Sequence, residues 1–220
     1  MFRRDYILRM IEEMSGVIGT FLGLKQQKKH TEMLWELDEQ YKKHFRLTRE
    51  LLNSLSIRDI IEMFRYGGIV EADRLQSAAL LMKEEALVYM DNQETDKGLI
   101  RSIKSLHLFL YAALEGADRS LWSLETQVSE LESLVKGYRL PSETEKLLLR
   151  YEEDRGRYDL AENALYRMIE RSIIQPDEAR EFYERLLKLS PEQLDKGGLP
   201  LVEVEEGLAN LSRVENYHTN

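Results

Sequence analysis

The chain has 220 residues, 43% of them hydrophobic and 32% charged, which is ordinary for a soluble globular protein with a sizeable core. Its formal net charge of −9 argues against general nucleic-acid binding, because phosphate contacts need a concentrated basic surface. The absence of cysteine excludes disulfides, thiolate catalysis and cysteine zinc sites, and it suits the reducing cytoplasm.

Helix-forming residues dominate, and only 4 prolines and 12 glycines are present, so the sequence predicts an all-α protein. Apolar residues recur at helical spacing along most of the chain. We expect helices at ten places, near residues 3–24, 29–45, 56–65, 71–91, 96–115, 118–136, 142–155, 158–172, 176–188 and 201–211.

The first of these helices is amphipathic rather than membrane-spanning. Arg9, Glu12 and Glu13 interrupt its apolar residues, and the chain contains no uncharged stretch of 18 residues. We therefore expect neither a signal peptide nor membrane binding, although contact with a membrane surface is the alternative.

Three glycines lie on one side of the same helix, at Gly16, Gly19 and Gly23. Each costs about 1 kcal/mol of helix stability relative to alanine, so close approach of another helix is the simplest compensation. That helix belongs either to the same chain or to a second subunit, which makes a homodimer one of the alternatives.

Several helix boundaries can be read from single residues. Asp118 is placed to cap a helix that begins at Arg119, and Ser142 with Glu145 fits a capping box. Pro176 suits the first turn of the following helix, where a missing N–H costs little. The segment 190–200 is expected to hold one helical turn at most, followed by a loop.

Residues 142–175 have the pattern of two antiparallel helices joined at Gly156. Ala161 and Ala164 place small side chains on one face of the second helix, and Pro176 follows the unit. Two helices can cross closely only where a side chain is small, and the resulting pairs must stack to bury their apolar faces. This unit resembles the tetratricopeptide repeat, a helical hairpin of 34 residues.

Two further segments fit the same pattern less fully. Residues 79–112 place Ala86, Gly98 and Ser105 at the small positions. Residues 14–47 match in length and amphipathicity only, with Lys28 at the turn. Together these segments predict one domain over residues 1–220, built of stacked antiparallel hairpins as a tetratricopeptide-like superhelix or right-handed helical array, with an irregular bundle as the alternative.

The start of the chain, "MFRRDYILRMIEE", and its tail, "GGLPLVEVEEGLANL", resemble a bacterial family of tetratricopeptide-like proteins of about this length. This likeness covers most of the chain. It implies a helical fold and a cytoplasmic bacterial setting, but it implies no activity.

No catalytic or cofactor-binding motif is present, and the four histidines are scattered. We expect His107 to be a core histidine, Trp35 and Trp122 to pack in the core, and adjacent carboxylates such as Glu84–Glu85 and Glu152–Glu153 to be solvated. The sequence therefore predicts neither metal nor cofactor and no enzymatic activity. A pocket that joins His107 with a carboxylate would favour the enzyme alternative.

The first helices of stacked hairpins line a concave groove in tetratricopeptide-like proteins, so the resemblance implies which residues face it. Those with charged or large side chains are Lys83, Leu87, Met90, Lys146 and Arg150, with Glu153 and Asp154 beside the last two. The cations would suit an acidic segment or a C-terminal carboxylate. We therefore expect a non-catalytic adaptor that binds a protein or peptide; ordinary solvated charges and a structural homo-oligomer are the alternatives.

Overall fold

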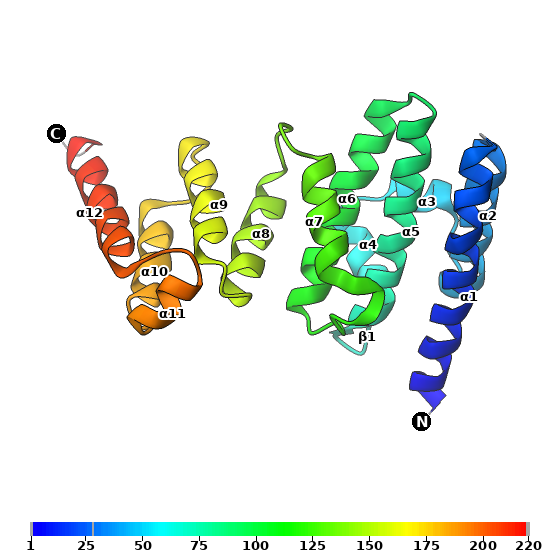
Figure 1. Cartoon of the computed structure of the whole chain (residues 1–220), viewed down its shortest axis with the longest axis horizontal. Helices are drawn as coiled ribbons and strands as arrows, with labels where there is room; N and C mark the ends of the chain where they lie inside the picture. The colour runs from blue at the N-terminus through cyan, green and yellow to red at the C-terminus, as the bar shows by residue number, and fades with distance from the viewer. Residues whose placement is uncertain (1, 28, 219–220) are drawn as a thin grey trace. The chain divides into compact units, whose positions relative to one another are not determined.

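The computed structural model describes residues 2–27 and 29–218 (Figure 1). Helices make up nearly all of its regular structure, which confirms the predicted all-α class. The contacts divide the chain into two compact units, residues 1–139 and 140–220, which are described separately below. One domain over 1–220 stays a prediction.

Unit 1 begins with a helical hairpin, α1 (Phe2–Gln26) and α2 (His30–Phe45), followed by the short helices α3 (Arg49–Ser54) and α4 (Ile57–Met63). A two-stranded antiparallel hairpin, β1 (Arg65–Tyr66) and β2 (Ile69–Val70), pairs Tyr66 with Ile69. The helix expected over 56–65 ends early because Gly67 and Gly68 turn the chain at positive φ, 58° and 84°.

The long helices α5 (Ala72–Asp91) and α6 (Thr95–Leu114) form the central hairpin of unit 1 (Figure 1). A Cβ added at Gly98 would lie 2.6 Å from Met90 Cγ and 2.9 Å from the Ala86 carbonyl oxygen, so the helices meet closely there. Farther along, the Ser105 hydroxyl donates a hydrogen bond to the Ala79 carbonyl at 2.7 Å. The small residues predicted in 79–112 therefore do lie at a helix crossing.

Unit 1 ends with a 3-10 turn, η1 (Leu121–Ser123), and α7 (Leu124–Leu134). The helix predicted from Arg119 begins later because Trp122 and Ser123 have positive φ, 61° and 52°. Asp118 stabilises the preceding turn instead, where its carboxylate accepts hydrogen bonds from the Ser120 amide and hydroxyl.

Unit 2 contains α8 (Ser142–Asp154), α9 (Tyr158–Glu170), α10 (Pro176–Leu186), α11 (Pro191–Lys196) and α12 (Leu201–His218). Pro176 stands at the start of α10 as predicted. The capping box predicted at Ser142 and Glu145 is wrong: Pro141 precedes α8, and Glu145 is buried in ion pairs. The capping box belongs to Ser190 and Gln193, where α11 replaces the expected loop.

The core of unit 2 gathers the inward faces of its helices. The fully buried Ala161, Ala164 and Met168 of α9 pack with Phe182 and Tyr183 of α10. Gly156 joins α8 to α9 at a φ of 67°, as the sequence predicted for the turn.

We expect Ala161→Leu to lower the free energy of unfolding by about 1–3 kcal/mol, because a leucine side chain would overpack this fully buried position. Urea unfolding followed by far-UV circular dichroism measures the loss. Asn163→Leu is the matched control on the exposed face of α9, where the change should stay within about 0.5 kcal/mol. Equal stability of both variants would show that Ala161 is not at a tight crossing.

Two expectations for α1 and α2 are corrected. Apart from the backbone of α1 itself, no described atom lies within 4 Å of a Cβ added at Gly16, Gly19 or Gly23, so no other described helix packs on the glycine face; a helix of a second subunit stays a prediction. Trp35 is 62% exposed rather than in the core. The buried Met33, Leu37 and Gln40 agree with the hairpin expected over 14–47, whereas Lys28 lies outside the described residues.

No helix in the described part of the chain combines the length and apolar character that a membrane crossing needs. The homodimer stays a prediction.

Candidate functional site

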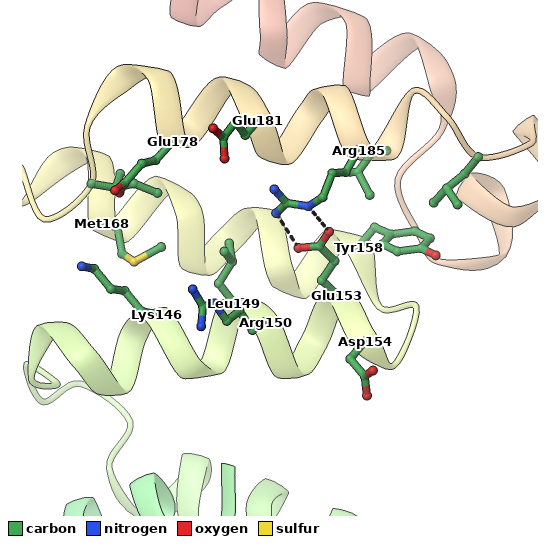
Figure 2. Close-up of a pocket in the computed structure, with 13 residues that line it drawn as sticks. Lys146, Leu149, Arg150, Glu153, Asp154, Tyr158, Met168, Glu178, Glu181 and Arg185 are labelled. Carbon is green, nitrogen blue, oxygen red and sulfur yellow. Dashed lines mark hydrogen bonds and ion pairs between the residues drawn. The ribbon is translucent and has the colours of Figure 1, made fainter. Parts of the chain in front are cut away.

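An open groove of about 710 Å³ runs between α8 and α10 in unit 2 (Figure 2). Its apolar surface comes from the helices α8, α9 and α10 and from the segments that follow α9 and α10. The apolar lining residues are Leu149, Tyr158, Met168, Ile174, Leu186 and Leu189. The groove therefore offers a hydrophobic floor between two helical walls.

The two walls carry opposite charges along one part of the groove. Lys146 and Arg150 stand one turn apart on α8, and Glu178 and Glu181 stand nearly one turn apart on α10 (Figure 2). Among the described residues, Arg150, Glu178 and Glu181 make no hydrogen bond or ion pair, and Lys146 approaches only Glu143, at 3.7 Å. This part of the groove thus presents cations opposite anions, with no ion pair described between the two walls there; within α10 the charge of Glu181 also acts on Arg185.

At its Tyr158 end the groove is bridged by a two-point ion pair. Arg185 Nε and Nη2 of α10 donate to Glu153 Oε1 and Oε2 of α8 at 2.7 and 2.8 Å. The hydrogen bond from Arg185 to Glu153 raises the pKa of the guanidinium. The pair links the walls, so it limits how far α8 and α10 can separate.

Buried ion pairs hold α8 beside its groove-facing residues. Glu145 accepts hydrogen bonds from Arg167 at 3.1 and 3.2 Å and from Arg171 at 3.3 Å. Nearer the turn, Glu152 accepts one from Arg157 at 2.5 Å. These ion pairs attach α8 to α9 and to Arg157, the residue before α9. They therefore hold in place the helix that carries Lys146 and Arg150.

A close backbone contact fixes the Tyr158 end. The amides of Tyr158 and Asp159 donate to the Gly197 carbonyl at 2.8 and 3.3 Å. A Cβ at Gly197 would lie 2.6 Å from the Gly156 carbonyl oxygen, so only glycine allows this approach. The turn after α11 therefore supports the start of α9.

The groove contains some of the residues predicted to face a partner and not others. Lys146, Arg150, Glu153 and Asp154 line it as expected. Lys83 belongs to unit 1, and its expected exposure is wrong: it is 4% exposed and donates a hydrogen bond to Gln127 of α7 at 2.6 Å, beside an ion pair with Glu130.

Leu87 and Met90 also lie in unit 1. Leu87 lines a separate cavity between α1, α2 and α5, and Met90 is half-buried against Gly98 at the α5–α6 crossing. Neither residue belongs to the groove in unit 2, because both lie on α5 and contact other parts of unit 1.

The anionic wall of the groove was missed. Glu178, Glu181 and Arg185 lie beyond the repeat recognised over 142–175, so the resemblance gave them no role. All three lie on one polar face of an amphipathic helix that begins at Pro176, and this spacing is the sequence pattern from which they could have been predicted.

The adjacent carboxylates are not uniformly solvated, as had been expected. Glu85 is fully buried, and Glu152 is 1% exposed. Burial raises the pKa of the Glu152 carboxyl, while Arg157 acts in the opposite direction. Two neighbouring acids of one helix can therefore differ in burial, one fully buried and the other partly exposed, depending on which of them faces the neighbouring helix.

The described residues contain no group of three or more histidine, aspartate or glutamate side chains that could hold a metal ion. His107 is 7% exposed within α6, in agreement with the prediction of a core histidine. It is absent from the lining of the groove and of the cavity that Leu87 contacts. The prediction that the protein is not an enzyme stays a prediction.

Comparison with known proteins identifies a family but no characterised relative. No curated protein and no solved structure gives a significant match to the chain. A family model described as "Family of unknown function (DUF6483)" matches residues 1–216, nearly the whole sequence. The chain therefore belongs to this family of unknown function.

Proposed function

We propose that the protein is a non-catalytic adaptor whose α8–α10 groove binds an amphipathic helical segment of another protein. The observation that supports this most strongly is the pair of oppositely charged walls above an apolar floor, where Lys146 and Arg150 face Glu178 and Glu181 without a described ion pair across the groove. Docking of an amphipathic helix into an apolar groove is a recurring mode of peptide recognition.

Charge complementarity defines the occupant. One flank of the segment carries acidic side chains that meet Lys146 and Arg150, and the other carries basic side chains that meet Glu178 and Glu181. Spacings of three and four residues within each wall match neighbouring positions on a helix, so flanking charges of a bound helix can pair with both members. Its apolar stripe then covers Leu149, Met168 and Ile174.

Repeat character supports the same function. We infer that the α8–α9 and α5–α6 hairpins are tetratricopeptide-like units, because small residues are buried where their helices pack: Gly98 in α6, and Ala161 and Ala164 in α9. The α5–α6 hairpin, from Ala72 to Leu114, is longer than a 34-residue repeat. Helical repeats of this kind stack to present concave surfaces for partners. A cytoplasmic location is part of this proposal.

Synthetic helices test the groove directly. Three amphipathic peptides of about 16 residues share one apolar stripe and differ in their flanks, which are acidic and basic, both acidic, or both basic. We expect the acidic–basic peptide to bind wild-type protein about tenfold more tightly than the other two, in fluorescence anisotropy at low salt.

The double variant Lys146→Glu/Arg150→Glu should lose at least about tenfold in affinity for the acidic–basic peptide. Lys188→Glu/Lys196→Glu makes the same charge change at exposed positions of unit 2 outside the groove, and it should bind as wild type does. Equal losses of affinity in both variants would show that the effect depends only on net charge. That result would contradict peptide binding in the groove.

A further inference from the structure

A second cavity, of about 180 Å³, lies in unit 1 between α1, α2 and α5. Its walls are mostly apolar, and four ionisable side chains stand among them. The apolar residues are Ile18, Phe21, Met33, Leu87 and Val88, and the ionisable ones are Lys25, His30, Glu84 and Asp91. The cavity is the size of a small organic molecule rather than of a peptide.

Helical spacing explains why these residues meet. On α5, Leu87, Val88 and Asp91 follow Glu84 by three, four and seven residues, so all four share one face of the helix. Glu84 and Asp91, seven residues apart, stand at the two ends of the apolar stripe formed by Leu87 and Val88. The cavity thus has a hydrophobic middle and a carboxylate near each end.

Glu84 is the unpaired acid of this cavity. It makes no hydrogen bond or ion pair with any described residue, whereas its neighbour Glu85 accepts several. Burial raises the pKa of the Glu84 carboxyl; Lys83 lowers it, Glu130 raises it, and Lys25 lowers it. A partly buried carboxylate beside apolar side chains is stabilised by any cation that reaches it.

The other acid already has a partner. Asp91 Oδ2 lies 2.8 Å from His30 Nε2, and Lys25 is exposed at the edge of the cavity. Glu84 therefore stands without such a partner in the lining, although the charge of Lys25 acts on it from the edge.

We propose that this cavity binds a small organic cation, a primary amine on a short hydrocarbon chain, with its ammonium group on Glu84 and its chain against Phe21, Met33 and Leu87. The ammonium supplies the hydrogen-bond donors that Glu84 lacks, and the hydrocarbon covers the apolar wall. This site is independent of the groove in unit 2.

Three probes of matched size separate charge from hydrophobicity: n-butylammonium, n-butanol and butyrate. Titrations followed by NMR give affinities and, from the shifts of Met33 and Val88, the location. We expect n-butylammonium to bind at least about tenfold more tightly than the other two, with saturation at millimolar concentration. Glu84→Gln should abolish this advantage while leaving the weak affinity for n-butanol unchanged.

Glu50→Gln is the matched control, since it removes one carboxylate from an exposed position of unit 1. It should retain the preference for the amine. The proposal is overturned if n-butanol or butyrate binds as well as the amine, if Glu50→Gln and Glu84→Gln have equal effects, or if no shift saturates below about 10 mM.

Discussion

Glu85→Gln is expected to lower the free energy of unfolding by about 3 kcal/mol. The fully buried Glu85 accepts hydrogen bonds from Arg101 and Asn53, both at 2.9 Å, and lies 3.5 Å from Arg49. Glutamine would keep the shape but remove the charge that two partly buried guanidinium groups share. Breaking such a pair costs more than the pair contributes, because the remaining charges stay desolvated.

The adjacent Glu84 supplies the matched control. Glu84→Gln removes the same charge one residue away, but this carboxylate has no described ion pair, so we expect a change below about 1 kcal/mol. Both tryptophans, Trp35 and Trp122, belong to unit 1, so urea unfolding followed by tryptophan fluorescence reports on this unit. Similar losses in the two variants would contradict the role of the Glu85 network.

Phe182→Ala should cost about 3–5 kcal/mol, because it leaves a cavity in the core of unit 2. Phe182 is fully buried on α10 and packs edge-on against Tyr183, with ring centroids 5.2 Å apart. The side chain lies under the groove wall, so its loss loosens the helix that carries Glu178, Glu181 and Arg185 as well.

Unit 2 contains no tryptophan, so far-UV circular dichroism during urea unfolding measures this effect. Leu187→Ala is the matched control: it also replaces an apolar side chain near the end of α10, but that side chain is 38% exposed. We expect the control to change stability by less than about 1 kcal/mol. A comparable loss for Leu187→Ala would mean that burial at Phe182 does not determine its contribution.

Local sequence signals predicted the helices and their crossings well. Pro176 marked the start of α10, and the small residues Gly98, Ser105 and Ala161 marked positions where helices pack closely. These signals act over one or two helical turns, so a single sequence can reveal them. The η1 turn and the β1–β2 hairpin were missed because positive φ at Trp122 and Ser123 and pairing of two-residue strands leave almost no periodic pattern.

The burial and partners of several charged residues depend on contacts between segments far apart in the chain, which a single sequence does not reveal. Lys83 was expected in solvent, yet its partners Gln127 and Glu130 stand more than forty residues away on α7. Glu84 and Glu85 are neighbours with opposite environments, which depend on what α5 faces on each side. In the groove, the cations of α8 were predicted, whereas the acids of α10 that complete it lay outside the recognised repeat.

The most direct test of the groove is a reversal of peptide preference. Wild-type protein and Lys146→Glu/Arg150→Glu are titrated with the same three amphipathic helices. Because the double variant has two acidic walls, we expect it to prefer the peptide with two basic flanks, while wild-type protein prefers the acidic–basic peptide. If both proteins rank the three peptides in the same order, the α8–α10 groove is not the binding surface.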